Sequence, residues 1–356
     1  MRSPERPGRL AGETLSVGFV VLAVLAVLAL VPLPYVVMRP GPATDTLGEV
    51  KGRPIITIEG TRTYPATEES GELLFTTVRV VGGPGVRVNA FDVVSGWASR
   101  QDSVVPEEQV FPPDVTEQEV QQENTAEMAD SQEVAAALAL RAAGRRVPER
   151  VVVASVPDAA PAAGALREGD VLLSIDGRPA SGTDAVRSAV RATPAGEEVT
   201  VVVERDGRRQ SVQAGTGSVG GRTVLGVTLR MSYDLPAEVR IEAGAVGGPS
   251  AGMMFTLGIY DLLTPGPLTG GNEVAGTGTV DDAGAVGPIG GIRQKLFGAR
   301  DAGAGYFLAP AANCGEVVGH VPSGLRVVRV ADVDGAIDAV ERVAAGDVTA
   351  LPRCTG

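Results

Sequence analysis

The alternation of hydrophobic and polar positions predicts strands and helices along most of this chain of 356 residues. Period-two alternation predicts strands at ITIEG (56–60) and LLFTTVRVV (73–81), and helical spacing predicts a helix over 89–99. From residue 224 strands and helices alternate: the strands VLGVTLRM and AEVRIEA, an apolar helix from Ser250, a glycine-rich strand at VAGTGTV, the helix IRQKLFGARDAG, the strands GYFLAP and LRVVRV, and a last helix near Asp332. This alternation predicts an α/β or α+β domain.

The longest apolar run lies near the N-terminus. Residues 15–31 read LSVGFVVLAVLAVLALV without a charge, and the apolar character continues to residue 38. About twenty such residues suffice to cross a bilayer as a helix. Three arginines in 1–14 favour a cytoplasmic tail. A cleaved signal peptide would need a small-x-small site, and a core helix a polar face, so we expect a retained single-pass anchor at 15–38 with the remaining domains extracytoplasmic.

The charge pattern argues against a nucleic-acid partner. The formal net charge is -12, and no basic stripe opposes the acidic residues. No basic residue occurs between 101 and 140, whereas Thr116 and Glu119 form a capping-box signature before a thin apolar edge. We interpret 106–143 as a solvated acidic helical connector, with a regulatory acidic surface as the alternative.

A compact unit with its own turns spans 144–214. It contains the run AGALREGDVLLSIDG at 163–177, with a hairpin turn at Asp176-Gly177. This run resembles PDZ domains of the bacterial type found beside serine proteases. PDZ domains add a peptide to a sheet edge and hold its terminal carboxylate in a loop of backbone N–H groups. The resemblance places that loop at 144–150, where the chain reads GRRVPER rather than a GLGF-like sequence, so carboxylate capture and a spacer or gate role both remain open.

The pattern G-x-S-x-G at 248–252 makes Ser250 a candidate nucleophile. A serine hydroxyl needs a neighbouring base. A hydrolase triad would use His320, the only histidine of the chain, with Asp281, Asp282 or Asp301. His320 lies in a polar loop about 70 residues after the serine, which is a short separation for that fold, so we regard this triad as the weaker alternative.

Lysine is the other candidate base. The chain has 31 Lys and Arg residues, but only Lys51 and Lys295 are lysines. Arginine does not release its proton in proteins, whereas a lysine buried in apolar surroundings can lose several pKa units and act as a general base. A solvent-exposed position on its helix would make Lys295 unremarkable, so its role depends on the surrounding motifs.

The motifs GPSAG (248–252), PIGGIRQK (288–295) and FGARDAGAGYFLAPAANCGEV (297–317) resemble the proteolytic domain of the Lon-type, S16 serine peptidases. The resemblance implies that Ser250 is the nucleophile, Lys295 its base and Thr277 a residue that orients the lysine. Because Ser250 is expected to begin a helix, the backbone N–H groups of Ser250 and Ala251 are candidates for an oxyanion hole.

The resemblance extends to the whole architecture. Residues 50–105 and 215–345 would form one α+β proteolytic domain, into which the connector 106–143 and the PDZ unit 144–214 are inserted, followed by a tail at 346–356. Together with the anchor, this arrangement resembles the membrane-anchored, PDZ-containing, YlbL-like group of Lon-type proteases. No G-x-x-x-x-G-K-[ST] motif occurs, so we expect no nucleotide, and no cofactor. Lon-type domains form rings, which suggests a hexamer.

The sequence thus predicts an ATP-independent serine endopeptidase that acts on exported or membrane-associated proteins and peptides. The alternative from another class is a catalytically silent, membrane-tethered PDZ adaptor. Cys314 and Cys354 could form a disulfide outside the cytoplasm or remain two free thiols. We expect no metal site, because neither cysteine has companions at metal-ligand spacing.

Overall fold

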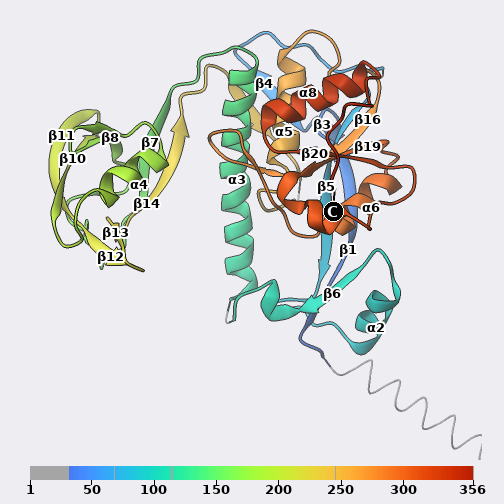
Figure 1. Cartoon of the computed structure of the whole chain (residues 1–356), viewed down its shortest axis with the longest axis horizontal. Coiled ribbons are helices and arrows are strands. Elements are labelled where there is room, and N and C mark those ends of the chain that lie inside the picture. Colours follow the sequence, from blue (N-terminus) through green and yellow to red (C-terminus); the bar gives the residue numbers. More distant parts are fainter. Residues whose placement is uncertain (1–31, 68, 114, 245, 356) are drawn as a thin grey trace, which may run out of the picture.

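The computed structural model describes residues 32–355, apart from residues 68, 114 and 245 (Figure 1). The part of the expected anchor at 15–31 lies outside the described residues. The end of the expected anchor, from Tyr35 to residue 38, belongs to strand β1 (Tyr35–Asp45) rather than to a helix. The expected boundary at 38 is therefore wrong: Pro32 and Pro34 disfavour a continuing helix, and the valines that follow are buried in a sheet. None of the described helices is long and apolar enough to span a bilayer.

A larger body is built on a six-stranded sheet with the order β20-β19-β16-β5-β1-β6. Besides β1, its strands are β5 (Glu72–Val81), β6 (Ser103–Pro106), β16 (Glu273–Gly276), β19 (Tyr306–Pro310) and β20 (Arg326–Val330). β5, β16, β19 and β20 run parallel, and β1 pairs antiparallel with β5 and β6. The sheet thus joins chain segments from before and after the inserted smaller body, and its first strand begins ahead of the expected start at residue 50.

Alternate residues of the central strands enter two different cores, as the strand period requires. Leu73 and Phe75 face the core formed with α3 (Glu117–Ala142), α5 (Gly252–Leu263) and α8 (Val333–Ala344). Leu74 faces the opposite core, formed with α6 (Ile292–Asp301) and α7 (Cys314–Val317). The sheet therefore lies between two helical layers, and α5 and α6 lie in different ones.

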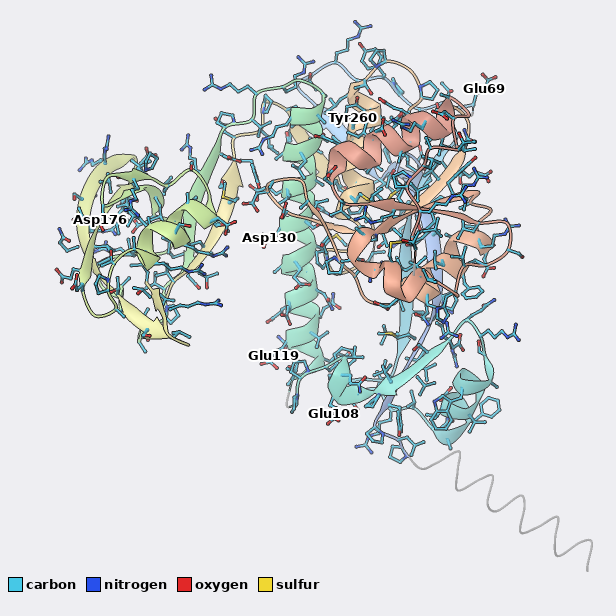
Figure 2. The ribbon with its side chains drawn as sticks, viewed as in Figure 1. Glu69, Glu108, Glu119, Asp130, Asp176 and Tyr260 are labelled. Atoms are coloured by element: carbon cyan, nitrogen blue, oxygen red, sulfur yellow. A yellow bond between two sulfur atoms is a disulfide. The ribbon has the colours of Figure 1, made fainter. Side chains whose placement is uncertain are left out.

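The acidic segment is not a solvated connector throughout. Helix α3 begins with the expected capping box of Thr116 and Glu119, and its first half is largely exposed. Its second half, from Ala135 to Leu140, is buried in the same core as α5. Asp130 points away from the larger body (Figure 2). The acidic residues occupy the outer face, and small apolar residues on the inner face let α3 pack closely on α5.

The smaller body has a sheet of order β11-β10-β8-β7-β14 and its own apolar core. Its elements are β7 (Glu149–Ser155), β8 (Val171–Ile175), β9 (Arg178–Pro179), α4 (Thr183–Arg191), β10 (Glu198–Arg205), β11 (Arg208–Gly215), β12 (Gly217–Val219), β13 (Arg222–Val224) and β14 (Thr228–Tyr233). Because β14 pairs with β7 along six residue pairs, this body extends beyond the expected end at residue 214.

Smaller elements complete the larger body. Strand β15 (Glu238–Ile241) pairs with β4 (Ile56–Glu59), and β2 (Glu49–Val50), β3 (Arg53–Pro54), β17 (Thr279–Val280) and β18 (Val286–Gly287) form two short hairpins. Helix α2 (Ala90–Ala98) packs beside β1 and β6. A disulfide joins Cys314 to Cys354, with a Cα–Cα distance of 5.0 Å, and so fastens the C-terminal tail to α7.

Candidate active site

Three predicted site residues meet at the end of strand β16. Lys295 projects from α6, Ser250 lies just before α5, and Thr277 directly follows β16. The Lys295 Nζ atom lies 2.9 Å from Ser250 Oγ and 3.0 Å from Thr277 Oγ1. It also lies 2.9 Å from the backbone oxygen of Thr76 in β5. The lysine therefore reaches the serine from the opposite helical layer, past the end of strand β16.

The hydrogen bonds around Lys295 determine which partner accepts a proton from Nζ and which partner donates one to it. The carbonyl of Thr76 can only accept. The hydroxyl of Thr277 donates its one proton to the carbonyl of Ser250 at 2.9 Å, so it must accept from Lys295. A neutral lysine amine has two N–H donors and one lone pair, and these two acceptors take both donors. The lone pair is left for the third partner, the hydroxyl of Ser250, which is the geometry of a nucleophile and its base.

Burial sets the protonation state of Lys295. Its side chain is only 3% exposed. Desolvation by burial lowers the pKa of Lys295 from 10.5 to about 7. A substantial fraction of this lysine is therefore neutral near physiological pH, as a general base requires.

The turn that carries Ser250 is held from two sides. The carbonyl oxygen of Ser250 accepts a hydrogen bond from the N–H group of Gly278 at 2.8 Å, two residues after β16 ends. On the other side the Ser131 hydroxyl of α3 donates to Pro249 O at 3.1 Å, and Gly248 N–H donates to Asn124 O at 3.0 Å. Helix α3 thus supports the nucleophile, a role that the acidic composition of 101–140 concealed.

Ser250 precedes α5 instead of beginning it. The helix starts at Gly252 with Ala251 as its N-cap residue, so the expected start at Ser250 is two residues early. A side chain at Gly252 would approach the Ser131 hydroxyl to 2.6 Å, which explains the glycine there. Within the described part of the chain, the backbone N–H groups of Ser250 and Ala251 donate to no protein acceptor. Both lie at the positive end of the α5 dipole, the position expected for an oxyanion hole.

The histidine alternative lacks geometric support. The His320 side chain is exposed, and its Nδ1 atom contacts the backbone oxygen of Glu316 at 3.0 Å. The Asp281 carboxylate accepts hydrogen bonds within its own turn, and the donors are the N–H groups of Ala283 and Ala285. Within the described residues, Lys295 is the only side chain that hydrogen-bonds the Ser250 hydroxyl. Those residues also contain no group of three or more His, Cys, Asp or Glu side chains suited to a metal ion.

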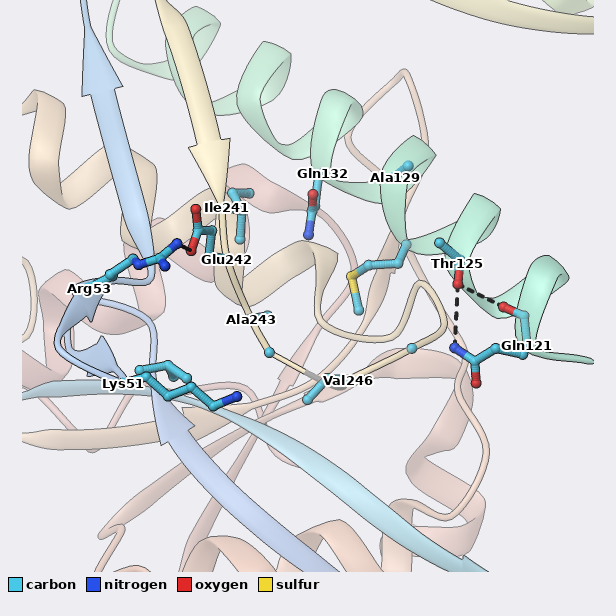
Figure 3. Close-up of a pocket in the computed structure, with 14 residues that line it drawn as sticks. Lys51, Arg53, Gln121, Thr125, Ala129, Gln132, Ile241, Glu242, Ala243 and Val246 are labelled. Carbon is cyan, nitrogen blue, oxygen red and sulfur yellow. Dashed lines mark hydrogen bonds and ion pairs between the residues drawn. The ribbon is translucent and has the colours of Figure 1, made fainter.

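A cleft of about 580 Å³ lies beside the segment that precedes Ser250 in the sequence (Figure 3). Its walls are α3, the β2–β3 hairpin and residues 241–244, 246 and 247, the last of which lies three residues before the nucleophile. Gln132 projects from α3 toward that segment, and Met128 adds an apolar wall. Strand β15 pairs with β4 on one edge only, so in the described structure its other edge has no strand partner. Sequence patterns gave no indication of this cleft, because its three walls come from distant parts of the chain.

The smaller body has a second groove, which is formed by residues other than the expected carboxylate loop. The groove, of about 580 Å³, lies between α4 and β14 and is lined by Leu225, Gly226 and Val227. The expected loop at 144–150 does not line it. The Leu225-Gly226-Val227 loop immediately precedes β14, and in the described structure its three N–H groups donate to no protein acceptor. Gly226 has φ +76, and a side chain there would meet Pro161 at 2.7 Å, so the loop needs glycine.

Comparison with known proteins finds two family models that match adjoining, slightly overlapping parts of the chain. A family model of the PDZ domain matches residues 119–216, and one of the "Lon protease (S16) C-terminal proteolytic domain" matches residues 205–343. Lon protease from Phenylobacterium zucineum is 35% identical over 108 residues, which are 30% of this chain and 13% of that protein. Lon protease from Frankia alni is 39% identical over 110 residues, 30% of this chain and 12% of that protein. This chain therefore matches only a small part of each relative.

Among solved structures, the PDZ domain of an SdrC-like protein from Listeria monocytogenes is 25% identical to this chain, with a TM-score of 0.21. The match covers 22% of this chain and 85% of the Listeria chain. The family matches show that the chain contains a PDZ domain and the proteolytic domain of the Lon-type, S16 serine peptidases. Within the second match lie Ser250, Thr277 and Lys295.

Proposed function

We propose that this protein is a membrane-anchored serine endopeptidase that uses a Ser250–Lys295 dyad. One observation carries the proposal: the lone pair of a neutral Lys295 has a single hydrogen-bond donor available, the Ser250 hydroxyl at 2.9 Å. Both groups belong to the protein itself, so peptide cleavage requires neither a nucleotide nor a cofactor.

The geometry supports a two-step acyl transfer. Ser250 Oγ transfers its proton to Lys295 Nζ and bonds to the peptide carbonyl carbon, and the developing oxyanion is held by the N–H groups of Ser250 and Ala251. Collapse of the tetrahedral intermediate breaks the C–N bond as Lys295 returns the proton to the leaving amine. A water molecule then gives a proton to the neutral Lys295 and attacks the ester, and Ser250 regains its proton. Thr277 keeps the lysine aligned throughout.

The two grooves support a class of substrate. The unpaired edge of β15 can bind an extended peptide as an added strand that runs toward Ser250. In the PDZ domain, the open edge of β14 and the N–H groups of the Leu225-Gly226-Val227 loop can hold a peptide C-terminus. Arg187, Arg191 and Arg222 line that groove, so we propose that it prefers acidic tails. Flexible tails and loops are suitable substrates, because a chain must be extended to enter either groove.

The uncharged segment 15–31 supports the proposed anchor, with the catalytic domains outside the cytoplasm. The disulfide between Cys314 and Cys354 fits that oxidising side. We further propose a hexameric ring, by analogy with Lon-type domains alone.

The competing proposal is a catalytically silent PDZ adaptor. The test is cleavage of casein and of a fluorogenic peptide by the full-length protein in lipid nanodiscs. Wild type and His320→Ala should cleave equally, whereas Ser250→Ala and Lys295→Ala should lose activity by several orders of magnitude. Cleavage by Ser250→Ala at the wild-type rate, or none by the wild type, would refute the peptidase assignment.

A further inference from the structure

The outer face of α2 exposes three large apolar side chains. Phe91 is 76% exposed, Val94 59% and Trp97 64%, and their spacing of three residues places them on one side of the helix. Val86, four residues before the helix begins, is also exposed, at 50%. Isolated exposed apolar residues are common, but a helix that presents a Phe, a Val and a Trp together marks an interaction surface. We call these four residues the α2 patch.

The α2 patch stands on a firmly held support. Asn89 and Asp92 form a capping box at the start of the helix. On the inner face Val93 is buried, and Gly96 lies so close to the sheet that a side chain there would meet Val104 at 2.6 Å. The Trp97 ring packs edge-on against Tyr35 of β1, with the ring centroids 6.3 Å apart. The inner face and the Trp97–Tyr35 contact thus anchor α2 to the larger body, while most of the outer face stays exposed.

Charges around the α2 patch are of both signs, whereas the chain as a whole has a net charge of -12. Two of the nearby acidic groups, Asp92 and Asp102, pair with Arg39, at 3.7 and 3.5 Å, and a third, Glu117, has its carboxylate beside Gly85. Arg87 and Arg100 flank the patch and are exposed, and neither guanidinium has an ion-pair partner in the described part of the chain. An apolar face containing Trp and Phe and bordered by arginine is the composition of helices that lie in the membrane interface.

The α2 patch also lies next to the proposed anchor. The uncharged segment 15–31 ends immediately before the first described residue, Pro32. One residue later, Leu33 pairs with Val88, two residues before α2 begins. Figure 1 shows α2 at the same end of the molecule as the start of β1. An anchor that enters the bilayer here brings the α2 patch to the lipid surface.

We propose that the α2 patch lies in the interfacial layer of the bilayer, with Phe91, Val94 and Trp97 in the boundary between headgroups and acyl chains and Arg87 and Arg100 near anionic headgroups. This inference rests on the proposed anchor. The anchor and α2 together are two attachments, and two attachments fix the orientation of the proteolytic domain, whereas an anchor alone would let it rotate freely.

Trp97 is the only tryptophan of the chain and reports directly on this surface. The full-length protein is reconstituted into phosphatidylcholine–phosphatidylglycerol vesicles with or without brominated acyl chains, which quench tryptophan only on contact. Vesicle flotation measures the anchor independently. The matched control is Trp97→Phe with Val219→Trp, because Val219 is 67% exposed on the PDZ domain. A second variant, Phe91→Ser with Val94→Ser, makes the α2 patch less apolar. Both positions are exposed, so we expect the variant to fold, and circular dichroism verifies its folding.

We expect the floated wild type to be quenched several-fold more strongly by brominated lipid than the control, and the Phe91→Ser, Val94→Ser variant to approach the control. Flotation with control-level quenching overturns the inference while leaving the anchor intact. Protection of Trp97 from both brominated lipid and aqueous acrylamide, together with crosslinking between copies, assigns the patch to a protein contact and also overturns it. Failure to float refutes the anchor and this inference together.

Discussion

Replacing Lys295 by methionine should abolish proteolysis and stabilise the fold. Methionine has a similar length and no charge. Because burial lowers the pKa of Lys295 from 10.5 to about 7, keeping this side chain buried near pH 7 costs about 5 kcal/mol, at about 1.4 kcal/mol per pKa unit. The substitution leaves Thr76 O without its donor, which costs about 1–3 kcal/mol. The net expectation is a gain of about 2–4 kcal/mol in the free energy of unfolding at pH 7.

The pH dependence makes this prediction specific. Between pH about 7 and 10.5 the unfolded lysine keeps its proton, whereas the folded lysine has lost it. The unfolded state therefore binds more protons, and the stability of the protein with Lys295 rises with pH across this window. The gain from Lys295→Met is fully present at pH 7 and shrinks as the pH rises toward 10.5.

The assay is urea unfolding followed by circular dichroism at pH 7 and 9.5. Ser250→Ala is compared with Ser250→Ala, Lys295→Met, so that self-cleavage does not interfere. A loss of stability on Lys295→Met that is equal at both pH values would refute the reasoning, because it would mean that Lys295 is a structural ammonium ion held by its remaining acceptors, Thr76 O and Thr277 Oγ1.

Three further predictions concern groups around the two sites. Thr277→Val removes the acceptor of one Lys295 proton and should lower kcat about 10–100-fold, whereas Thr277→Ser keeps the hydroxyl and should retain most activity in the peptide assay. Replacing Cys314 and Cys354 by serine opens a loop with a sequence separation of 40 and should cost about 4 kcal/mol on the chain-entropy scale, measured by urea unfolding; unchanged stability would contradict it. Gly226→Ala should weaken binding of an acidic C-terminal peptide in calorimetry and leave cleavage of a small peptide intact.

The sequence was most informative where chemistry restricts the choice of residue. A chain with two lysines and one histidine offers few bases for a serine, and the motifs around Ser250 and Lys295 are long. The structure brings both side chains within hydrogen-bonding distance. The main strands and helices also follow the hydrophobic pattern, because their buried faces are continuous.

The sequence was least informative where distant segments meet. The outer face of α3 carries so many acids that its inner contacts with the Ser250 turn are hidden in the composition. Strand β14 belongs by sequence to the C-terminal part of the chain, yet it pairs with β7 and forms the PDZ groove. Alternation alone cannot reveal which partner a strand selects. The expected anchor end at residue 38 was wrong because valine-rich strands and apolar helices have similar compositions.

The central claim is that neutral Lys295 activates Ser250. It is tested most directly by the rate at which a peptidyl phosphonate forms a covalent adduct with Ser250, followed by intact-protein mass spectrometry across pH. The wild-type rate should rise through pH about 7 to a plateau, because burial sets the pKa of Lys295 there, and Lys295→Met should form no adduct. Adduct formation by Lys295→Met at the wild-type rate, or a wild-type rate that is flat from about pH 5 to 9, would contradict the dyad.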